Sequence, residues 1–246
     1  MKNILLLLLV ALPLFAGKIN IAVAANVSYA IDELKAEFAK RHPGTKVAVI
    51  LGGSGKLTAQ IKNGAPYGLF MSADMRYPQV LFNDRIATAE PAVYAQGALA
   101  LLSIKPRDFS KGIELLKSDS IGRIAIANPK TAPYGRAAAE ALKNAKVYDS
   151  IKKKFVYGES ISQTVAYAVT ATDIGIVAKS SLYSPKMSRY RENVNWSSVD
   201  PALYMPIKQG VVLLKNGAND EYRAFYDFIL SAEAKKIFKK YGYIVQ

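Results

Sequence analysis

The fold is decided by residues 46–62, KVAVILGGSGKLTAQIK. The β-branched run 46–50 predicts a strand, the glycines and Ser54 predict a turn, and residues 57–62 have helical spacing. Glycines let a backbone approach a ligand closely, and the first amides of a helix have no partner inside it. With a hydroxyl from Ser54 at the cap position, this turn suits a small anion. An ordinary strand-to-helix turn explains the same residues equally well.

A nucleotide-binding P-loop is excluded here by its spacing. That motif places a glycine five residues before its Gly-Lys pair and a Ser or Thr directly after the lysine. Ile50 and Leu57 occupy those two positions in this chain. The turn is therefore interpreted as a small-anion site and not as a nucleotide site.

Strands alternate with helices along the rest of the chain, which predicts an α/β fold with parallel strands. Apolar runs that predict strands occupy residues 19–24, 69–71, 94–104, 123–127, 154–157, 173–177 and 202–214. Helical spacing is found at residues 29–41, 77–83, 136–143, 161–169 and 222–241. The long run 94–104 is a candidate for a strand that passes from one lobe to another, and the last helical region for one that packs back onto the first lobe.

Four predicted turns connect a strand to a helix, at Asn26, at Ser54, at residues 128–135 and at residues 158–161. Asn26 or Ser28 is placed to cap the first of these helices. Ligands of parallel sheets lie at the carboxyl ends of the strands, so the four turns can share one cleft. Each helix N-terminus carries roughly half a positive charge, and four would supply about +2. That suits a dianion held without Arg or Lys.

Composition narrows the classes of function. The chain has 246 residues, a formal charge of +14, no Cys and a single His. Without Cys there is no disulfide framework, thiol nucleophile or Cys-ligated metal, and one His cannot support a His-rich metal site. Lys and Arg are scattered over predicted helix faces, as in residues 152–154 and 235–240, which favours a solvated surface. Lys56 and Lys130 are expected to face solvent.

The N-terminus has the pattern of a secretory signal. A short basic region, residues 1–3, precedes an apolar run at residues 4–15 that is too short to span a membrane. Ala16 and Gly17 offer a small-residue cleavage point. We therefore expect residues 1–16 to be a signal peptide and the protein to be exported to the periplasm. Export argues against nucleic acid as the partner of the basic surface.

Several motifs together resemble the periplasmic molybdate-binding proteins of molybdate ABC transporters, the ModA family. The resemblance covers nearly the whole mature chain in order, and its longest motif is GAPYGLFMSAD at residues 64–74. The shorter motifs lie at residues 21–26, 53–57, 128–135, 175–177, 224–228 and 237–242.

The resemblance implies a two-lobed periplasmic binding protein of type II, in which each lobe is a mixed, mostly parallel sheet flanked by helices. The implied lobes are residues 17–97 with 206–246, and residues 98–205, with the ligand cleft between them. The implied function is capture of molybdate, or of tungstate, and delivery to the membrane permease of an ABC importer. No catalytic residue, no cofactor, no direct protein ligand to a metal and a monomeric state are implied.

Position by position, the resemblance places ligand contacts at Asn26, with Ala25 beside it, and at Ser54 through its amide and hydroxyl. It places two more at the backbone amides of Tyr134 and Ile161. Some relatives add a tyrosine hydroxyl after the Gly-Ile-Val strand, where this chain has Ala178. The number of hydrogen bonds to the ligand, and the choice between molybdate and tungstate, stay open.

Two other functions stay open. One is an exported binding protein for sulfate, phosphate or an organic acid. The other is an exported hydrolase with Ser54 as nucleophile, which lacks a plausible base because the single histidine, His42, ends a predicted helix. Asp74 and Glu159 are acidic candidates for acid–base chemistry. Structural roles are favoured for both, a helix cap for Asp74 and a backbone or lobe contact for Glu159.

Overall fold

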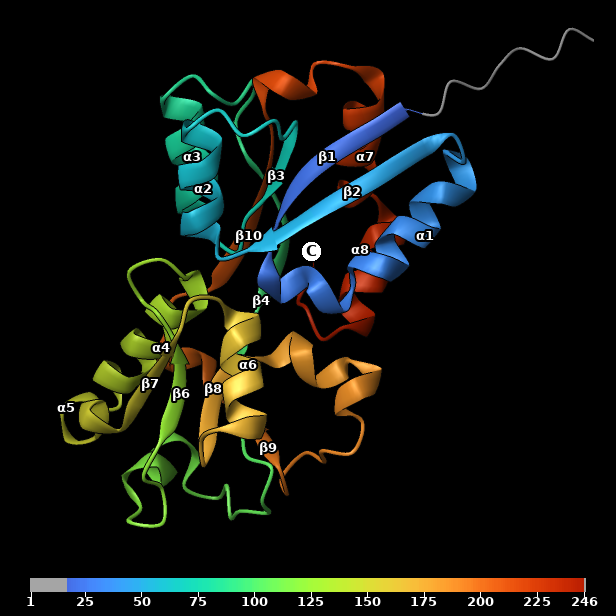
Figure 1. Ribbon diagram of the computed structural model, residues 1–246. Coiled ribbons are helices and arrows are strands. Elements are labelled where there is room, and N and C mark those ends of the chain that lie inside the picture. Colours follow the sequence, from blue (N-terminus) through green and yellow to red (C-terminus); the bar gives the residue numbers. More distant parts are fainter. Residues whose placement is uncertain (1–16, 246) are drawn as a thin grey trace, which may run out of the picture.

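The computed structural model describes residues 17–245 and contains two five-stranded sheets, each with helices packed against it (Figure 1). We call the part built on the first sheet lobe 1 and the part built on the second sheet lobe 2. In Figure 1 lobe 1 lies above lobe 2, and the two meet near the carboxyl ends of β1 and β2. No helix among residues 17–245 is both long and apolar enough to cross a bilayer.

The sheet of lobe 1 has the order β2-β1-β3-β10-β4. β1 pairs in parallel with β2 and with β3, whereas β10 is antiparallel to β3 and to β4. The strands are β1 (Gly17–Ala24), β2 (Thr45–Gly52), β3 (Leu69–Met71), β4 (Ala92–Gly97) and β10 (Ile207–Leu213). The helices of this lobe are α1 (Ile31–Arg41), α2 (Ser54–Lys62), α3 (Arg76–Asn83), α7 (Asp220–Leu230) and α8 (Ala232–Lys240).

The sheet of lobe 2 repeats this arrangement with the order β7-β6-β8-β5-β9. β6 is parallel to β7 and to β8, and β5 is antiparallel to β8 and to β9. The strands are β5 (Leu99–Leu102), β6 (Ile124–Ala127), β7 (Phe155–Gly158), β8 (Ile174–Ala178) and β9 (Trp196–Ser198). The helices are α4 (Pro133–Asn144), α5 (Tyr148–Ile151) and α6 (Ile161–Thr170). Both sheets are mixed, as expected, but parallel and antiparallel pairings are equal in number, so the sheets are not mostly parallel.

The chain passes between the sheets twice, between β4 and β5 and again between β9 and β10. The predicted strand 94–104 therefore joins the two sheets, but it is interrupted at Ala98 because β4 and β5 belong to different sheets. We keep the predicted boundaries between the lobes, at residues 97/98 and 205/206, as a proposal. The predicted signal peptide, residues 1–16, lies outside the described residues.

The C-terminal helices complete lobe 1, as the sequence predicts. Phe225 of α7 and Phe238 of α8 are fully buried, in one apolar cluster with Ile21 and Val23 of β1 and Phe38 of α1. Phe225 meets Phe38 edge to face with the ring centroids 5.0 Å apart, a favoured geometry for aromatic pairs. The end of the chain thus holds β1 in place, and β1 leads directly into the cleft.

Several helix starts differ from the prediction, and α4 begins at Pro133 instead of residue 136. α1 begins at Ile31 after a 3-10 turn, η1 (Ala25–Tyr29), and neither Asn26 nor Ser28 caps it. Asn26 is buried with its side chain bonded to distant residues, so it is not available as a cap. α2 begins at Ser54 and not at Leu57, with Gly53 as its N-cap. The glycine-rich segment is therefore itself the first turn of the helix.

Candidate ligand-binding site

A small cleft lies where the four predicted turns meet between the lobes. Its lining is Ala24, Ala25, Asn26, Gly52, Gly53, Ser54, Ala73, Ala132, Pro133, Tyr134 and Ile161. All five predicted contact residues belong to this set, and each is at most 5% exposed. The free space in the cleft is ≈ 10 Å³, which is about the space that one water molecule needs. In this arrangement of the lobes the cleft thus has room for about one water molecule.

Ser54 is the first residue of α2, where helix geometry leaves the amide N–H without an intrahelical acceptor. Its hydroxyl oxygen accepts a hydrogen bond from the amide of Ala73 at 3.0 Å. That bond uses a lone pair and leaves the hydroxyl hydrogen free to donate. Ser54 can therefore give a ligand oxygen two donors, as the resemblance implies, although Gly53 and not Ser54 is the N-cap.

Tyr134 stands second in α4, after Pro133. Proline has no N–H, so the amide of Tyr134 is the first donor of this helix. Among residues 17–245 it meets no backbone or side-chain acceptor. The phenol oxygen of Tyr134 points elsewhere and accepts a hydrogen bond from Gln209 Nε2 at 3.0 Å. Only the backbone of Tyr134 is thus offered to the cleft as a donor.

Ile161 is the first residue of α6. The side chain of the N-cap, Ser160, accepts from the amide of Gln163 at 3.2 Å, which leaves the amide of Ile161 unused. The next residue, Ser162, donates from its hydroxyl to the carbonyl of Ala25 in lobe 1 at 2.8 Å. This bond between the lobes, which the sequence did not suggest, holds the start of α6 against the turn after β1.

Asn26 is fully buried and belongs to a polar network that sequence analysis missed. Its Nδ2 donates to Gln209 Oε1 at 2.8 Å and to Tyr243 Oη at 2.9 Å. Gln209 also accepts from Tyr94 Oη at 2.7 Å and donates to Tyr134. The network joins η1, β4, β10 and the C-terminus in lobe 1 to α4 in lobe 2. Burial raises the pKa of Tyr94, Tyr134 and Tyr243, so all three are neutral phenols.

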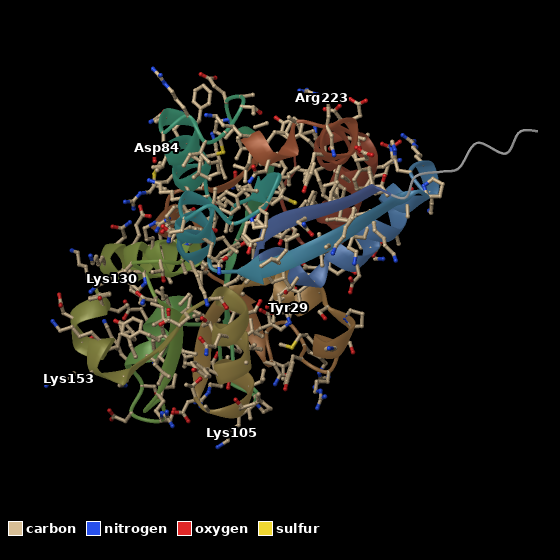
Figure 2. All side chains as sticks on the ribbon, turned by 45° about the horizontal axis from the view of Figure 1, so that its top comes forward. Tyr29, Asp84, Lys105, Lys130, Lys153 and Arg223 are labelled. Carbon is tan, nitrogen blue, oxygen red and sulfur yellow. The ribbon has the colours of Figure 1, made fainter. Side chains whose placement is uncertain are left out.

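The electrostatics of the cleft come from backbone dipoles. The lining residues carry no formal charge, and Lys56 and Lys130 are exposed, as predicted. The labelled basic side chains of Figure 2, Lys105, Lys130, Lys153 and Arg223, lie on the outside of the molecule. Three α-helix N-termini, and not four, contribute, because η1 replaces a helix start at the first turn. They supply about +1.5 in place of about +2.

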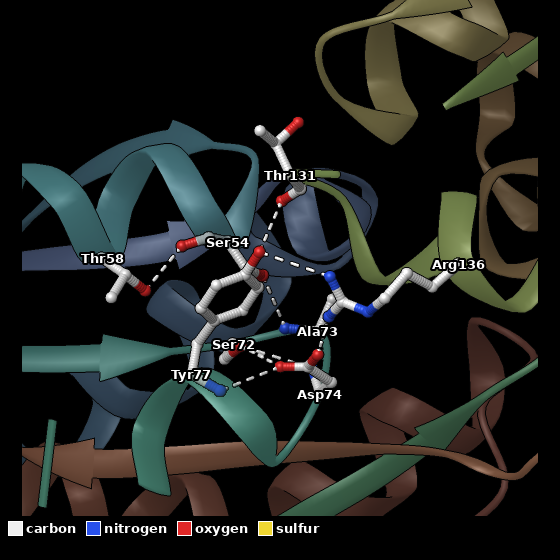
Figure 3. Close-up of polar contacts among 8 residues, drawn as sticks. All are labelled: Ser54, Thr58, Ser72, Ala73, Asp74, Tyr77, Thr131 and Arg136. Carbon is white, nitrogen blue, oxygen red and sulfur yellow. Dashed lines mark hydrogen bonds and ion pairs between the residues drawn. The ribbon is translucent and has the colours of Figure 1, made fainter. Parts of the chain in front are cut away.

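An ion pair and three hydrogen bonds join the lobes beside the cleft, and Figure 3 shows all of them except the bond from Gly55. Arg136 Nη2 of α4 pairs with Asp74 Oδ2, and Arg136 Nη1 donates to Tyr77 Oη at 3.3 Å. Tyr77 Oη and the amide of Gly55 both donate to the carbonyl of Thr131, at 3.3 Å and 3.0 Å. We call these five residues the interlobe latch. Asp74 Oδ1 also accepts from the amide of Tyr77 at 3.3 Å, although the N-cap of α3 is Met75 and not Asp74 as predicted.

No arrangement suited to hydrolysis surrounds Ser54 in the described part of the chain. His42 lies at the C-terminus of α1, with its ring stacked on Phe38 at 4.5 Å between centroids. Glu159 is exposed, and its backbone amide donates to Gln163 Oε1. Among residues 17–245 there is no group of three or more His, Cys, Asp or Glu side chains that could hold a metal ion.

The chain matches the family of bacterial extracellular solute-binding proteins over residues 19–244. It is 38% identical to the Molybdate-binding protein ModA of Rhodobacter capsulatus, over 96% of this chain and 92% of the relative. It is 35% identical to ModA of Azotobacter vinelandii, over 94% and 91%. The solved Azotobacter vinelandii periplasmic molybdate-binding protein superposes with a TM-score of 0.85 at 29% identity, covering 93% of this chain and 99% of that one. The chain therefore belongs to the bacterial extracellular solute-binding proteins, in the molybdate-binding ModA family.

Proposed function

We propose that this protein captures molybdate in the periplasm and delivers it to the membrane permease of an ABC importer. The observation that carries the proposal is the cleft between the lobes, in which unpaired amides from α2, α4 and α6 converge without a charged side chain. The relatives described above are named as molybdate-binding proteins. We assign Ala25, Asn26, Ser54, Tyr134 and Ile161 as the ligand contacts.

A tetrahedral dianion suits these donors. Its oxygens only accept hydrogen bonds, and each helix N-terminus favours negative charge. Neutral donors hold the anion without neutralising it by a counter-ion, so it can leave again when the lobes separate. An Arg or Lys ion pair inside a buried cleft would make release costly, because one partner would remain as an uncompensated charge.

Other oxyanions are distinguished by size and by protonation. A cleft built for molybdate leaves slack around the smaller sulfate, whose oxygens cannot reach all donors at once. Hydrogen phosphate brings a proton that needs an acceptor. The free groups of Ser54, Tyr134 and Ile161 are donors, and Asn26 Oδ1 is an unpaired acceptor in the lining as the structure stands. Tungstate has the same shape and charge as molybdate, and we propose it as a second ligand.

Binding and release follow the opening and closing of the lobes. The latch and the bond from Ser162 to Ala25 form only when the lobes meet, so they stabilise the closed form. We assign residues 1–16 as the export signal and treat the mature protein as a monomer that presents its closed form to the permease.

A competition titration tests this function. The mature protein is titrated by calorimetry with molybdate, tungstate, sulfate and phosphate, alone and in competition. We expect micromolar or tighter binding of molybdate, comparable binding of tungstate, and far weaker binding of sulfate and phosphate. Tighter binding of sulfate or phosphate than of molybdate would identify a different oxyanion as the ligand.

A further inference from the structure

The side-chain amide of Asn26 is only half satisfied. Its Nδ2 makes two hydrogen bonds, whereas its Oδ1 is buried and has no hydrogen-bond partner. A buried acceptor without a partner costs free energy. Because Asn26 lines the cleft, the free end of its amide is available to a ligand there. An acceptor at that end would repel an oxyanion.

Gln209 controls which end of the Asn26 amide is free. It is fully buried at an irregularity of β10, and three side chains of the network bond to its amide. Gln209 Oε1 accepts from Asn26 Nδ2 and from Tyr94 Oη, while Gln209 Nε2 donates to Tyr134 Oη. As long as the oxygen of Gln209 faces Asn26, the nitrogen of Asn26 must face Gln209.

A second arrangement is reached when both amide groups turn by half a rotation and the rest of the network stays in place. If both amides exchange their oxygen and nitrogen, Gln209 Nε2 donates to Asn26 Oδ1 and to Tyr94 Oη, and Tyr94 donates to the carbonyl of Ser72, 3.2 Å away. Gln209 Oε1 then accepts from Tyr134 Oη, and Asn26 Oδ1 accepts from Tyr243 Oη. The Tyr243 hydroxyl gives up its hydrogen bond to the carbonyl of Asn26, which keeps the hydroxyl of Ser180 at 3.5 Å. The other contacts stay donor–acceptor pairs, since a phenol can serve in either sense.

We propose that Gln209 is the positioning residue that turns the Asn26 amide so that Nδ2 donates to the bound oxyanion. The inference rests on the proposed function and extends it to a residue outside the cleft lining. The exchanged arrangement pairs Asn26 Oδ1, which has no partner at present among the described residues, and points an N–H at the ligand. The arrangement in the structure presents Asn26 Oδ1, an acceptor, to the cleft. That orientation suits the protein without ligand, or a protonated anion. Tyr134 carries the coupling across the lobes, because its phenol bonds to Gln209 while its backbone amide faces the cleft.

A double-mutant cycle tests the role of Gln209. The four variants are wild type, Gln209→Met, Asn26→Ala and the double variant, and the measured quantity is Kd by calorimetry for whichever of molybdate, tungstate, sulfate and phosphate binds wild type tightest. Gln209→Met keeps the volume and removes the amide. Gln96→Met, on the neighbouring strand β4 and outside the network, is the matched control. Thermal unfolding of each variant separates a loss of stability from a loss of affinity.

We expect Gln209→Met to raise Kd about five- to ten-fold in the presence of Asn26 and less than about two-fold after Asn26→Ala, because the effect passes through the Asn26 amide. The side-chain NH₂ resonances of Asn26 should shift on ligand binding in wild type and not in Gln209→Met. Additive effects of the two substitutions, or an unchanged Kd in a folded Gln209→Met variant, would overturn the inference.

If the tightest ligand is neither molybdate nor tungstate, the proposed function is overturned, while the cycle still tests Gln209. Binding of none of the four would overturn both.

Discussion

Arg136 in lobe 2 and Asp74 in lobe 1 form an ion pair across the mouth of the cleft. The Arg136 guanidinium also lies over the ring of Tyr77, 5.2 Å from its centroid. Both charged side chains are partly buried, with 28% exposure for Arg136 and 18% for Asp74. The pair joins the two lobes and lies outside the cleft lining, so we expect it to act on ligand affinity through lobe closure and not through contact with the ligand.

Arg136→Met should weaken molybdate binding. The substitution keeps the aliphatic stem and removes the ion pair, which at this exposure is worth about 1 kcal/mol, or about a five-fold rise in Kd. Calorimetry measures the change. The matched control is Lys62→Met, because Lys62 pairs with Asp84 at 2.5 Å entirely within lobe 1. Equal effects of the two substitutions would show that the latch has no special role in closure.

Gly55→Ala should hinder closure. A Cβ at this position would lie 2.6 Å from Tyr77 Oη and 2.8 Å from the carbonyl of Thr131 in lobe 2. The second contact is with backbone and cannot be relieved by a rotamer change, so the lobes must stay further apart. We expect at least about a ten-fold loss of affinity, consistent with an overpacking cost of about 1–3 kcal/mol. Gly122→Ala is the control, since its nearest neighbour, Asp173 Oδ2, would be 3.7 Å away. Unchanged affinity of Gly55→Ala would rule out this tight closure.

Ser54→Ala should remove one charge-assisted hydrogen bond to the ligand, at a cost of about 1.5–3 kcal/mol in binding. It also leaves the amide of Ala73 without its acceptor, so thermal stability of the ligand-free protein is measured alongside Kd. Ser188→Ala, which removes an exposed hydroxyl, is the control. A Kd equal to that of wild type would take the Ser54 hydroxyl out of the site.

Stability should fall at alkaline pH through the buried tyrosines. Burial raises the pKa of Tyr94, Tyr134 and Tyr243 above that of an exposed phenol. The folded protein favours the protonated phenols. Their contribution to the free energy of unfolding is therefore complete below a pH of about 10, and it is lost as the pH rises through the folded-state pKa values. Thermal unfolding from pH 8 to pH 11.5 measures the loss, which should be shallower in Tyr243→Phe. Tyrosinate absorbance from these three residues near pH 10 in a folded protein would contradict the assignment.

The sequence indicated the strands, the helices and the turns between them because those features are local. The β-branched and apolar runs before Ser54, Tyr134 and Ile161 predict strands, and the residues after them predict helices. The turns predicted helix starts with free amides near these positions, whereas the individual contacts at Tyr134 and Ile161 were implied only by the family resemblance. The start of α2 was missed because glycine has low helix propensity, and Gly55 is held in the helix by its bond to Thr131.

The contacts between the lobes could not be predicted in the same way. Gln209 is a polar residue inside an apolar strand pattern, and its partners Asn26 and Tyr134 are far away in the sequence. Arg136 has the sequence context of an ordinary exposed helix residue, yet it reaches Asp74 in the other lobe. A polar residue in the middle of a buried strand was the one available indication, since such residues are buried only with partners.

The most direct test of the central claim is a crystal structure of the mature protein grown with molybdate, with the metal located by anomalous scattering at the molybdenum edge. We predict one molybdenum atom between the lobes, with its oxygens within hydrogen-bond distance of the amides of Ser54, Tyr134 and Ile161 and with no Lys or Arg side chain in contact. A molybdenum atom bound outside this cleft, or held in it by charged side chains, would contradict the account.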